Sequence, residues 1–247
     1  MFSSQTNGLN WIAAIAIVSA TFLANVTFAG DKDPRALLEQ MSAEISGLDS
    51  FVLRGELYSD ARLEAGQLIE YASEVTMRVR RPDAMRLTIS TLENVKELYF
   101  GEGLLTFYNG LDNFYAQTEA PGGIAETADF AVHKVGIDAP LLDFLSSSIA
   151  ARLQENASEV QYLGPSLIRG QHYHHIAIRL PEIDVQIWVA SKGRPLPGKM
   201  ALSSKWEGGA PRSVTFFDWD TAPDFPSGKL GFTPPKDSSE IEFVLNN

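Results

Sequence analysis

Residues 74–89, EVTMRVRRPDAMRLTI, predict two neighbouring antiparallel strands joined by a short turn at Pro82-Asp83. Apolar residues occupy every second position on both sides of that turn, at Val75, Met77, Val79, Met85, Leu87 and Ile89. Most positions between them are polar or charged, which is typical of a sheet with one buried and one solvated face. Proline ends the first strand because it has no N–H to donate to a neighbouring strand. This segment therefore predicts a half-buried antiparallel sheet.

The same alternation continues on both sides of this hairpin. Further strands are predicted at 51–58, 96–100, 104–108, 114–116, 160–163, 172–180, 184–190, 198–206 and 213–219, with a last strand at 241–245. Asn109-Gly110 and Asp112-Asn113 are turn sequences between two of these strands. We expect a mainly antiparallel sheet of about ten strands.

One helical region precedes the strands and a second one interrupts them. Asp33-Pro34 predicts a helix start, because aspartate caps helices and proline suits the first helical position. The apolar residues that follow at helical spacing are Leu37, Met41, Ile45 and Leu48. Residues 122–156 again have helical spacing and predict two or three short helices, of which the second begins at Pro140. No linker or repeat divides the chain, so residues 30–247 are expected to form a single α+β domain.

Upstream of this domain, residues 11–29 (WIAAIAIVSATFLANVTFA) form an apolar run rich in small residues. Its end at Thr27-Phe28-Ala29 places small residues where a signal peptidase cleaves, and the next four residues are polar. Residues 1–29 are therefore predicted to be a cleavable signal peptide. An uncleaved anchor helix is the alternative, because the first ten residues carry no lysine or arginine. No cysteine follows the run, which excludes a lipid-anchored lipoprotein.

Composition excludes several classes of site. The chain has no cysteine, so disulfides, thiolate metal sites and cysteine nucleophiles are absent. Its formal net charge is −11, which argues against nucleic-acid binding, because that binding needs lysine and arginine to neutralise phosphates. The same charge disfavours docking to anionic lipid. Beyond residue 29 no segment approaches a membrane span, so no stable span is expected after cleavage.

The segment His172-Tyr173-His174-His175 offers weak metal-ligand candidates in His172 and His174. These two residues face the same side of a strand, and imidazole suits zinc or copper. A third ligand would have to come from the other available groups, His133, Asp184 or Asp218. The alternative is that His174 is a hydrogen-bonded core residue, and we favour it because no known ligand spacing is present. We therefore expect no metal and no other cofactor.

No catalytic motif stands out elsewhere in the chain. Asp218-Trp219-Asp220 places two carboxylates on one strand face, whereas a glycosidase needs two carboxyl groups facing each other across a cleft. Gly101-Glu102-Gly103 lacks the third glycine of a dinucleotide site. The patterns of serine hydrolases, β-lactamases and P-loop enzymes are also missing. A non-enzymatic protein is therefore expected.

An N-terminal helix is followed by a strand ending in Arg80-Arg81-Pro82 and later by the turn sequence Tyr108-Asn109-Gly110. This order resembles the superfamily of the bacterial lipoprotein carrier and its outer-membrane receptor. In closer detail the chain resembles the predicted periplasmic proteins catalogued as domain of unknown function 2092. The segments that carry this resemblance are Arg81-Pro82, Tyr108-Asn109-Gly110, 113–116, 136–141, 174–177, 184–188, Pro195-Leu196-Pro197, Phe217-Asp218-Trp219 and 232–235. The resemblance implies a periplasmic protein whose strongly curved sheet forms an open half-barrel. The central helical insertion would be its lid or plug.

A half-barrel has a concave face that its helices only partly fill. The resemblance therefore implies a hydrophobic ligand, either a lipid or an acylated protein, bound in that cavity by a monomer. The expected lining residues are Phe107, Phe114, Leu141, Leu142, Phe144, Leu145, Trp188 and Trp206. Two alternatives remain open: an envelope sensor that binds a protein partner, and a metal-dependent hydrolase built around His172 and His174.

Overall fold

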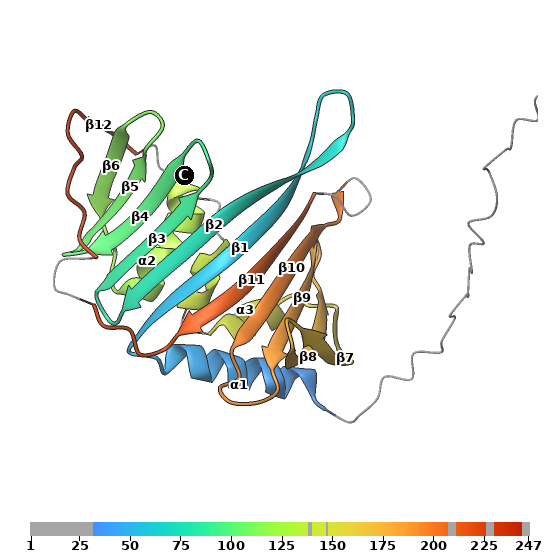
Figure 1. The fold of residues 1–247 in the computed structure, drawn as a ribbon. Coiled ribbons are helices and arrows are strands. Elements are labelled where there is room, and N and C mark those ends of the chain that lie inside the picture. Colours follow the sequence, from blue (N-terminus) through green and yellow to red (C-terminus); the bar gives the residue numbers. More distant parts are fainter. Residues whose placement is uncertain (1–31, 138–139, 147, 207–210, 226–229, 244–247) are drawn as a thin grey trace, which may run out of the picture.

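The protein is described by a computed structural model over residues 32–137, 140–146, 148–206, 211–225 and 230–243 (Figure 1). The predicted signal peptide, residues 1–29, lies outside these residues. The described chain forms one twelve-stranded sheet in the order β12-β6-β5-β4-β3-β2-β1-β11-β10-β9-β8-β7. All neighbouring strands pair antiparallel except β12 and β6, which are parallel. The predicted antiparallel sheet is confirmed.

The strand bounds follow the predicted alternation closely. The strands are β1 (Ser50–Arg62), β2 (Leu68–Arg80), β3 (Ala84–Ser90), β4 (Val95–Gly101), β5 (Leu104–Asn109), β6 (Phe114–Glu119), β7 (Glu159–Ile168), β8 (Gln171–Arg179), β9 (Ile183–Ala190), β10 (Pro197–Ser204), β11 (Arg212–Asp220) and β12 (Ser239–Ile241). The last strand begins two residues before the predicted 241–245, and residues 244–245 lie outside the described chain. It sits at the far edge of the sheet, beside β6.

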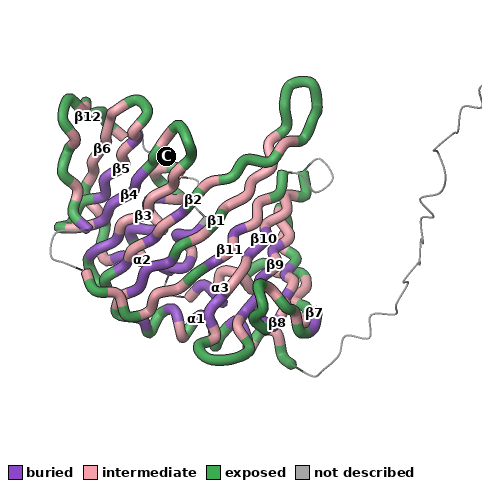
Figure 2. The backbone as a smooth tube through the Cα atoms, viewed as in Figure 1, coloured by how far each residue is buried: buried purple, intermediate pink, exposed green. Residues whose placement is uncertain are grey.

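β1 and β2 are longer than predicted. They pair in continuous register from Ser50 and Arg80 to Arg62 and Leu68, and their distal halves project beyond the sheet as a two-stranded arm (Figure 1). Figure 2 shows that this arm is largely exposed. Because the arm has no buried face, its sequence shows no alternation of apolar and polar residues. The arm is held together by backbone hydrogen bonds between its two strands.

The N-terminal helix α1 (Pro34–Ser46) begins as predicted, because the Asp33 side chain accepts a hydrogen bond from the Arg35 backbone N–H at 2.9 Å. It buries the predicted stripe of apolar side chains. The last of them, Leu48, lies just beyond the helix end and is also buried. This helix contributes to the same core as the sheet.

The central insertion consists of four short pieces rather than two or three helices. They are α2 (Ile124–Phe130), the π-helical turn η1 (Ala131–Val135), the 3₁₀ segment η2 (Pro140–Leu145) and α3 (Ile149–Gln154). The predicted second helix is divided because Ser146 donates its hydroxyl to the Asp143 carbonyl, and the Ser148 hydroxyl caps α3 by accepting from Ala151 N–H. Among the described helices, none is long and apolar enough to cross a membrane.

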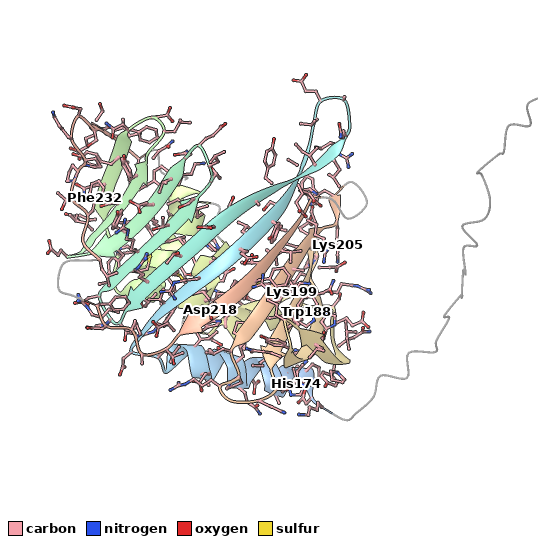
Figure 3. The ribbon with its side chains drawn as sticks, in the orientation of Figure 1. His174, Trp188, Lys199, Lys205, Asp218 and Phe232 are labelled. Atoms are coloured by element: carbon pink, nitrogen blue, oxygen red, sulfur yellow. The ribbon has the colours of Figure 1, made fainter. Side chains whose placement is uncertain are left out.

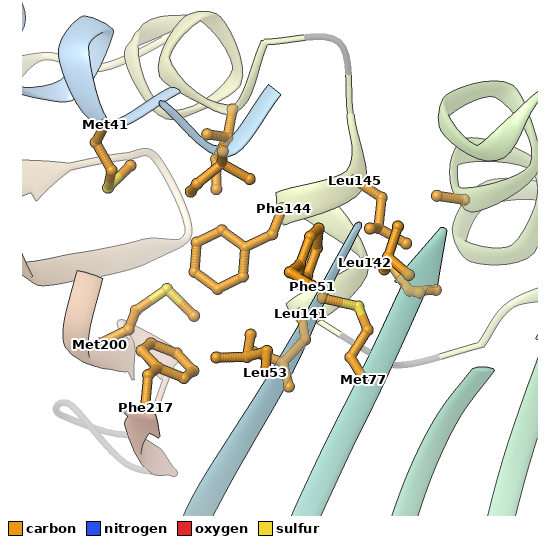
Figure 4. Packing of buried hydrophobic residues seen from close by; sticks show 14 of the residues in the cluster. Met41, Phe51, Leu53, Met77, Leu141, Leu142, Phe144, Leu145, Met200 and Phe217 are labelled. Atoms are coloured by element: carbon orange, nitrogen blue, oxygen red, sulfur yellow. The ribbon is translucent and has the colours of Figure 1, made fainter. Parts of the chain in front are cut away.

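The helices cover one face of the sheet, which we call the inner face. This face carries Leu53, Met77 and Leu87, which stand side by side on β1, β2 and β3. Their side chains join those of α1 and the insertion in one large core (Figure 4). The opposite face, which we call the outer face, is turned toward the viewer in Figure 1 and carries Arg54, Thr76 and Asp218.

The outer face has its own, smaller coverings. At one end the C-terminal segment lays Phe232 against three tyrosines, with ring centroids 5.1 Å from Tyr99, 6.2 Å from Tyr108 and 5.2 Å from Tyr115. At the other end Tyr173, Trp188 and Ala201 form a second buried cluster. The sheet therefore has buried side chains on both faces.

Candidate ligand-binding site

A pocket of about 490 Å³ lies on the inner face between the helical insertion and strands β9 and β10. It is lined by Val132, Gly136, Ile137, Asp143, Ile149, Arg152, Leu153, Leu180, Ile183, Val185, Met200 and Leu202. The strand residues reach it because they occupy alternate positions of one face, as Val185 and Leu202 show by standing opposite each other. The volume falls within the usual range for small-molecule sites.

The chemistry of this pocket is aliphatic. Its apolar lining comes from valine, leucine, isoleucine and methionine, with no aromatic side chain among the lining residues. A flat ring would find nothing to stack on, whereas a flexible hydrocarbon chain can follow aliphatic walls. The charged groups among the lining residues are Asp143 and Arg152. This arrangement can hold an apolar chain, and the carboxylate in the lining, that of Asp143, is paired with Arg152.

Arg152 ties the insertion together beside this pocket. Its guanidinium donates to Asp143 Oδ1 at 2.8 Å and also forms an ion pair with Asp129. These carboxylates belong to η2 and α2, so one side chain of α3 joins three pieces of the insertion. All three groups are half-exposed, so each pair contributes modestly to stability.

The predicted lid residues are part of the solid core. Leu142 and Phe144 are each 1% exposed, and Leu141 and Leu145 are also buried. Phe144 packs edge-on against Phe217, with ring centroids 5.4 Å apart (Figure 4). Of the two roles left open by the sequence, lid or plug, their burial fits the plug. None of them lines the pocket.

Phe107 and Phe114 lie far from the pocket along the sheet. They stand on β5 and β6, with ring centroids 6.3 Å apart, and both are half-buried. β5 and β6 are separated from β9 and β10 by five intervening strands in the sheet order. The two phenylalanines therefore belong to a different part of the inner face.

The structure corrects the expected positions of both tryptophans. Trp188 is only 6% exposed, but its ring stacks on His175 on the outer face, with centroids 4.1 Å apart. Trp206 is 68% exposed and donates its indole N–H to Glu182 beside the β8–β9 turn. Trp188 fails as an inner-face residue because it follows Ile187 by one position, which turns it to the opposite face. Trp206 lies just beyond the end of β10.

The histidine segment lies as its alternation predicts. His174 is buried on the inner face, where its Nδ1 lies 3.1 Å from the Tyr162 hydroxyl and its Nε2 lies 3.2 Å from Lys32 Nζ. Burial lowers the pKa of His174 below the usual histidine range, and the charge of Lys32 adds to this effect. This matches the core-residue interpretation of His174.

The metal alternative finds no third ligand in the described part of the chain. No group of three histidine, aspartate or glutamate side chains there could hold a metal ion. His172 is exposed, and Asp184 and Asp218 stand on the outer face, across the sheet from His174. His133 instead contacts the Asp129 carbonyl on its own helical segment.

Sequence reasoning named none of the strand residues that line the pocket. The signal for them was present, since Ile183 and Val185 on β9 alternate as Met200 and Leu202 do on β10. What the sequence did not show is where the insertion leaves space uncovered. The residues expected from the sequence included two tryptophans because large aromatic side chains favour apolar sites. The pocket is instead bordered by aliphatic residues.

Comparison with known protein families finds one match, to the family described as "Predicted periplasmic protein (DUF2092)", over residues 35–244. No curated protein matches this chain. Among solved structures, an uncharacterised conserved protein from Thermus thermophilus is similar, with a TM-score of 0.50 and 9% identity, covering 85% of this chain and 99% of that one.

Two further solved structures are more distant. A LolA superfamily protein from Nitrosomonas europaea has a TM-score of 0.39 and 11% identity, covering 82% of this chain and 99% of that one. The lipoprotein LppX from Mycobacterium tuberculosis has a TM-score of 0.45 and 12% identity, covering 79% and 99%. At these identities the similarity concerns the fold alone.

Proposed function

This chain belongs to the family of predicted periplasmic proteins DUF2092, and we propose that it is a non-enzymatic periplasmic protein that binds a hydrophobic ligand. The proposed ligand is a lipid or the acyl chain of an acylated protein, and the proposed site is the inner-face pocket beside β9 and β10. The observation that carries this proposal is the aliphatic lining of that pocket.

The pocket suits a single hydrocarbon chain better than a bulky lipid. Burying one methylene contributes about 0.8 kcal/mol, so ten methylenes contribute about 8 kcal/mol before the cost of association. A complex of this kind is expected to be micromolar or weaker, which suits a protein that must also release its ligand.

The direct test is native mass spectrometry of the protein purified from its own periplasm, followed by lipid extraction. A bound species of lipid or acyl mass supports the proposal. A protein that is empty after gentle purification, and that also takes up no acyl probe, overturns it.

A matched pair of variants locates the site. The probe is 11-(dansylamino)undecanoic acid, whose fluorescence rises in apolar surroundings. Leu202→Trp fills the pocket from β10 and should weaken probe binding at least tenfold, whereas Leu92→Trp adds the same ring at a fully exposed turn and should leave binding unchanged. Equal binding by both variants would show that the probe does not bind in the inner-face pocket.

A further inference from the structure

A second and larger cavity lies on the outer face, away from the inner-face pocket. It is a groove of about 740 Å³ that crosses β2, β1, β11, β10 and β9. Its floor includes Arg54, Thr76, Phe216 and Asp218, and Figure 3 labels Asp218 on this face. Four strand spacings of about 4.8 Å make the groove about 19 Å wide across the strands.

The turn between β7 and β8 forms one wall of this groove. Arg169 in that turn reaches Glu56 on β1 with a nitrogen–oxygen distance of 2.8 Å. The same guanidinium lies 4.5 Å from the centroid of the Phe216 ring. These contacts join residues 113 positions apart in sequence, so the groove has a defined wall.

The two ends of the groove carry opposite charge. At the β2 end, Glu74 stands directly opposite Glu56 on β1, and Arg169 neutralises only Glu56. At the other end, the connection between β9 and β10 supplies Lys192 and Arg194, and Arg194 is paired with Glu44 of α1. Within the described chain, the side chains of Glu74 and Lys192 have no hydrogen-bond or ion-pair partner.

The middle of the groove is balanced and partly apolar. Arg54 and Asp218 stand opposite each other on β1 and β11, so their charges compensate locally. Ile168, Tyr173 and Pro197 add apolar surface beside them. A hydrocarbon chain would meet charges at both ends, and a polyanion would meet Glu74 and Asp218.

We propose that this groove binds a short extended peptide of about five residues with free termini. An extended chain rises about 3.3 Å per residue, so five or six residues match the width of the groove. The α-ammonium group lies at Glu74 and the α-carboxylate at Lys192, because each terminus then meets the unpaired opposite charge. A central apolar side chain packs on Tyr173 and Pro197.

The proposal is tested by NMR titration of the full mature chain with the peptide Ala-Ala-Leu-Ala-Ala. The expected result is saturable shifts of groove amides such as Arg54 and Thr76. Acetylating the amino terminus or amidating the carboxyl terminus should each weaken binding about two- to fivefold, as expected for the loss of one solvent-exposed charge contact. No saturable shift, or equal binding by blocked and free peptides, overturns the proposal.

Two variants test which end of the groove binds which terminus of the peptide. The Glu74→Gln variant should no longer prefer a peptide with a free amino terminus over an acetylated one. The Lys192→Gln variant should no longer prefer a peptide with a free carboxylate over an amidated one. The matched controls are Glu64→Gln and Lys134→Gln, which change exposed charges outside the groove and should bind like the unaltered protein. If the controls weaken binding as much as the groove variants, attraction is non-specific and the site is wrong. Neither groove variant should alter binding of the dansyl probe, which separates this proposal from the inner-face pocket.

Discussion

Ile187 and Trp188 are neighbours on β9, yet they belong to different hydrophobic cores. Ile187 is fully buried on the inner face beneath the helices, whereas Trp188 lies on the outer face between His175 and Lys199. The inner face is covered by helices and packs mainly aliphatic groups and phenylalanine. The outer face is covered by a turn and the C-terminal segment, and it combines aromatic rings with charges. One sheet thus presents two surfaces with different chemistry, and four predictions test how far they differ.

The largest expected effect concerns the plug of the inner face. Phe144→Ala should lower the free energy of unfolding by about 3–5 kcal/mol, because it removes a fully buried ring from a packed core. Urea unfolding followed by circular dichroism measures this change. Leu92→Ala is the control, since Leu92 is fully exposed at a turn and should change little. A loss below about 1 kcal/mol for Phe144→Ala would mean that the plug is loosely packed.

On the outer face, the polar network around Glu97 should matter less. The Glu97 carboxylate accepts from Arg86 at 2.5 Å, from Thr88 at 3.1 Å and from Tyr99 at 2.5 Å. Glu97→Ala should cost about 1–3 kcal/mol, because three donors lose their acceptor while Arg86 keeps access to water. The same unfolding experiment measures it, with Glu93→Ala as an exposed control. If Glu97→Ala lowers the free energy of unfolding as much as Phe144→Ala does, the two faces do not differ in their contribution to stability.

Phe232 tests whether the C-terminal covering is a separable part of the outer face. Phe232→Ala removes three aromatic contacts and should cost about 1–2 kcal/mol, with the effect concentrated in the tail. Amide exchange at β12 should speed up, while exchange at β1 and β9 should stay as it was. Uniform acceleration across the whole sheet would show instead that the tail supports the entire fold.

The smallest effect is a pH dependence shared by both faces. Burial lowers the pKa of His174 and of His175, with Lys32 and Lys199 adding to the respective effects. The unfolded chain therefore binds more protons than the folded one below the ordinary histidine pKa of about 6.5, so stability falls as pH drops through that range. Unfolding midpoints at pH 7.5 and 5.5 measure the slope. His174→Gln should flatten it, whereas substituting the exposed His172 should not.

Much of this fold could be predicted from local sequence. The alternation around Val75 and Met77 gave the central strands, and Asp33 gave the start of α1. These features depend on a few adjacent residues, because strand periodicity and helix capping act over one to four positions. The family is likewise confirmed, since its model matches residues 35–244.

The candidate site could be predicted only in part. The alternation assigns Trp188 and Ile187 to opposite faces, and applying it strictly would have removed Trp188 from the inner-face candidates. The pocket beside Val185 and Leu202 depends instead on where the insertion ends. Its position follows from how α3 and η1 pack, and this packing leaves no periodic signal in the chain.

The sequence by itself determined the strands, their turns and the N-terminal helix, because each follows from short-range hydrogen bonding and the spacing of apolar residues. The tertiary structure alone decided which elements cover each face. The contact between Arg169 and Glu56 spans 113 positions, and the packing of Phe144 on Phe217 joins the insertion to β11. Such contacts depend on the three-dimensional path of the whole chain, so the inner-face pocket and the outer-face groove emerge only when the sheet is assembled.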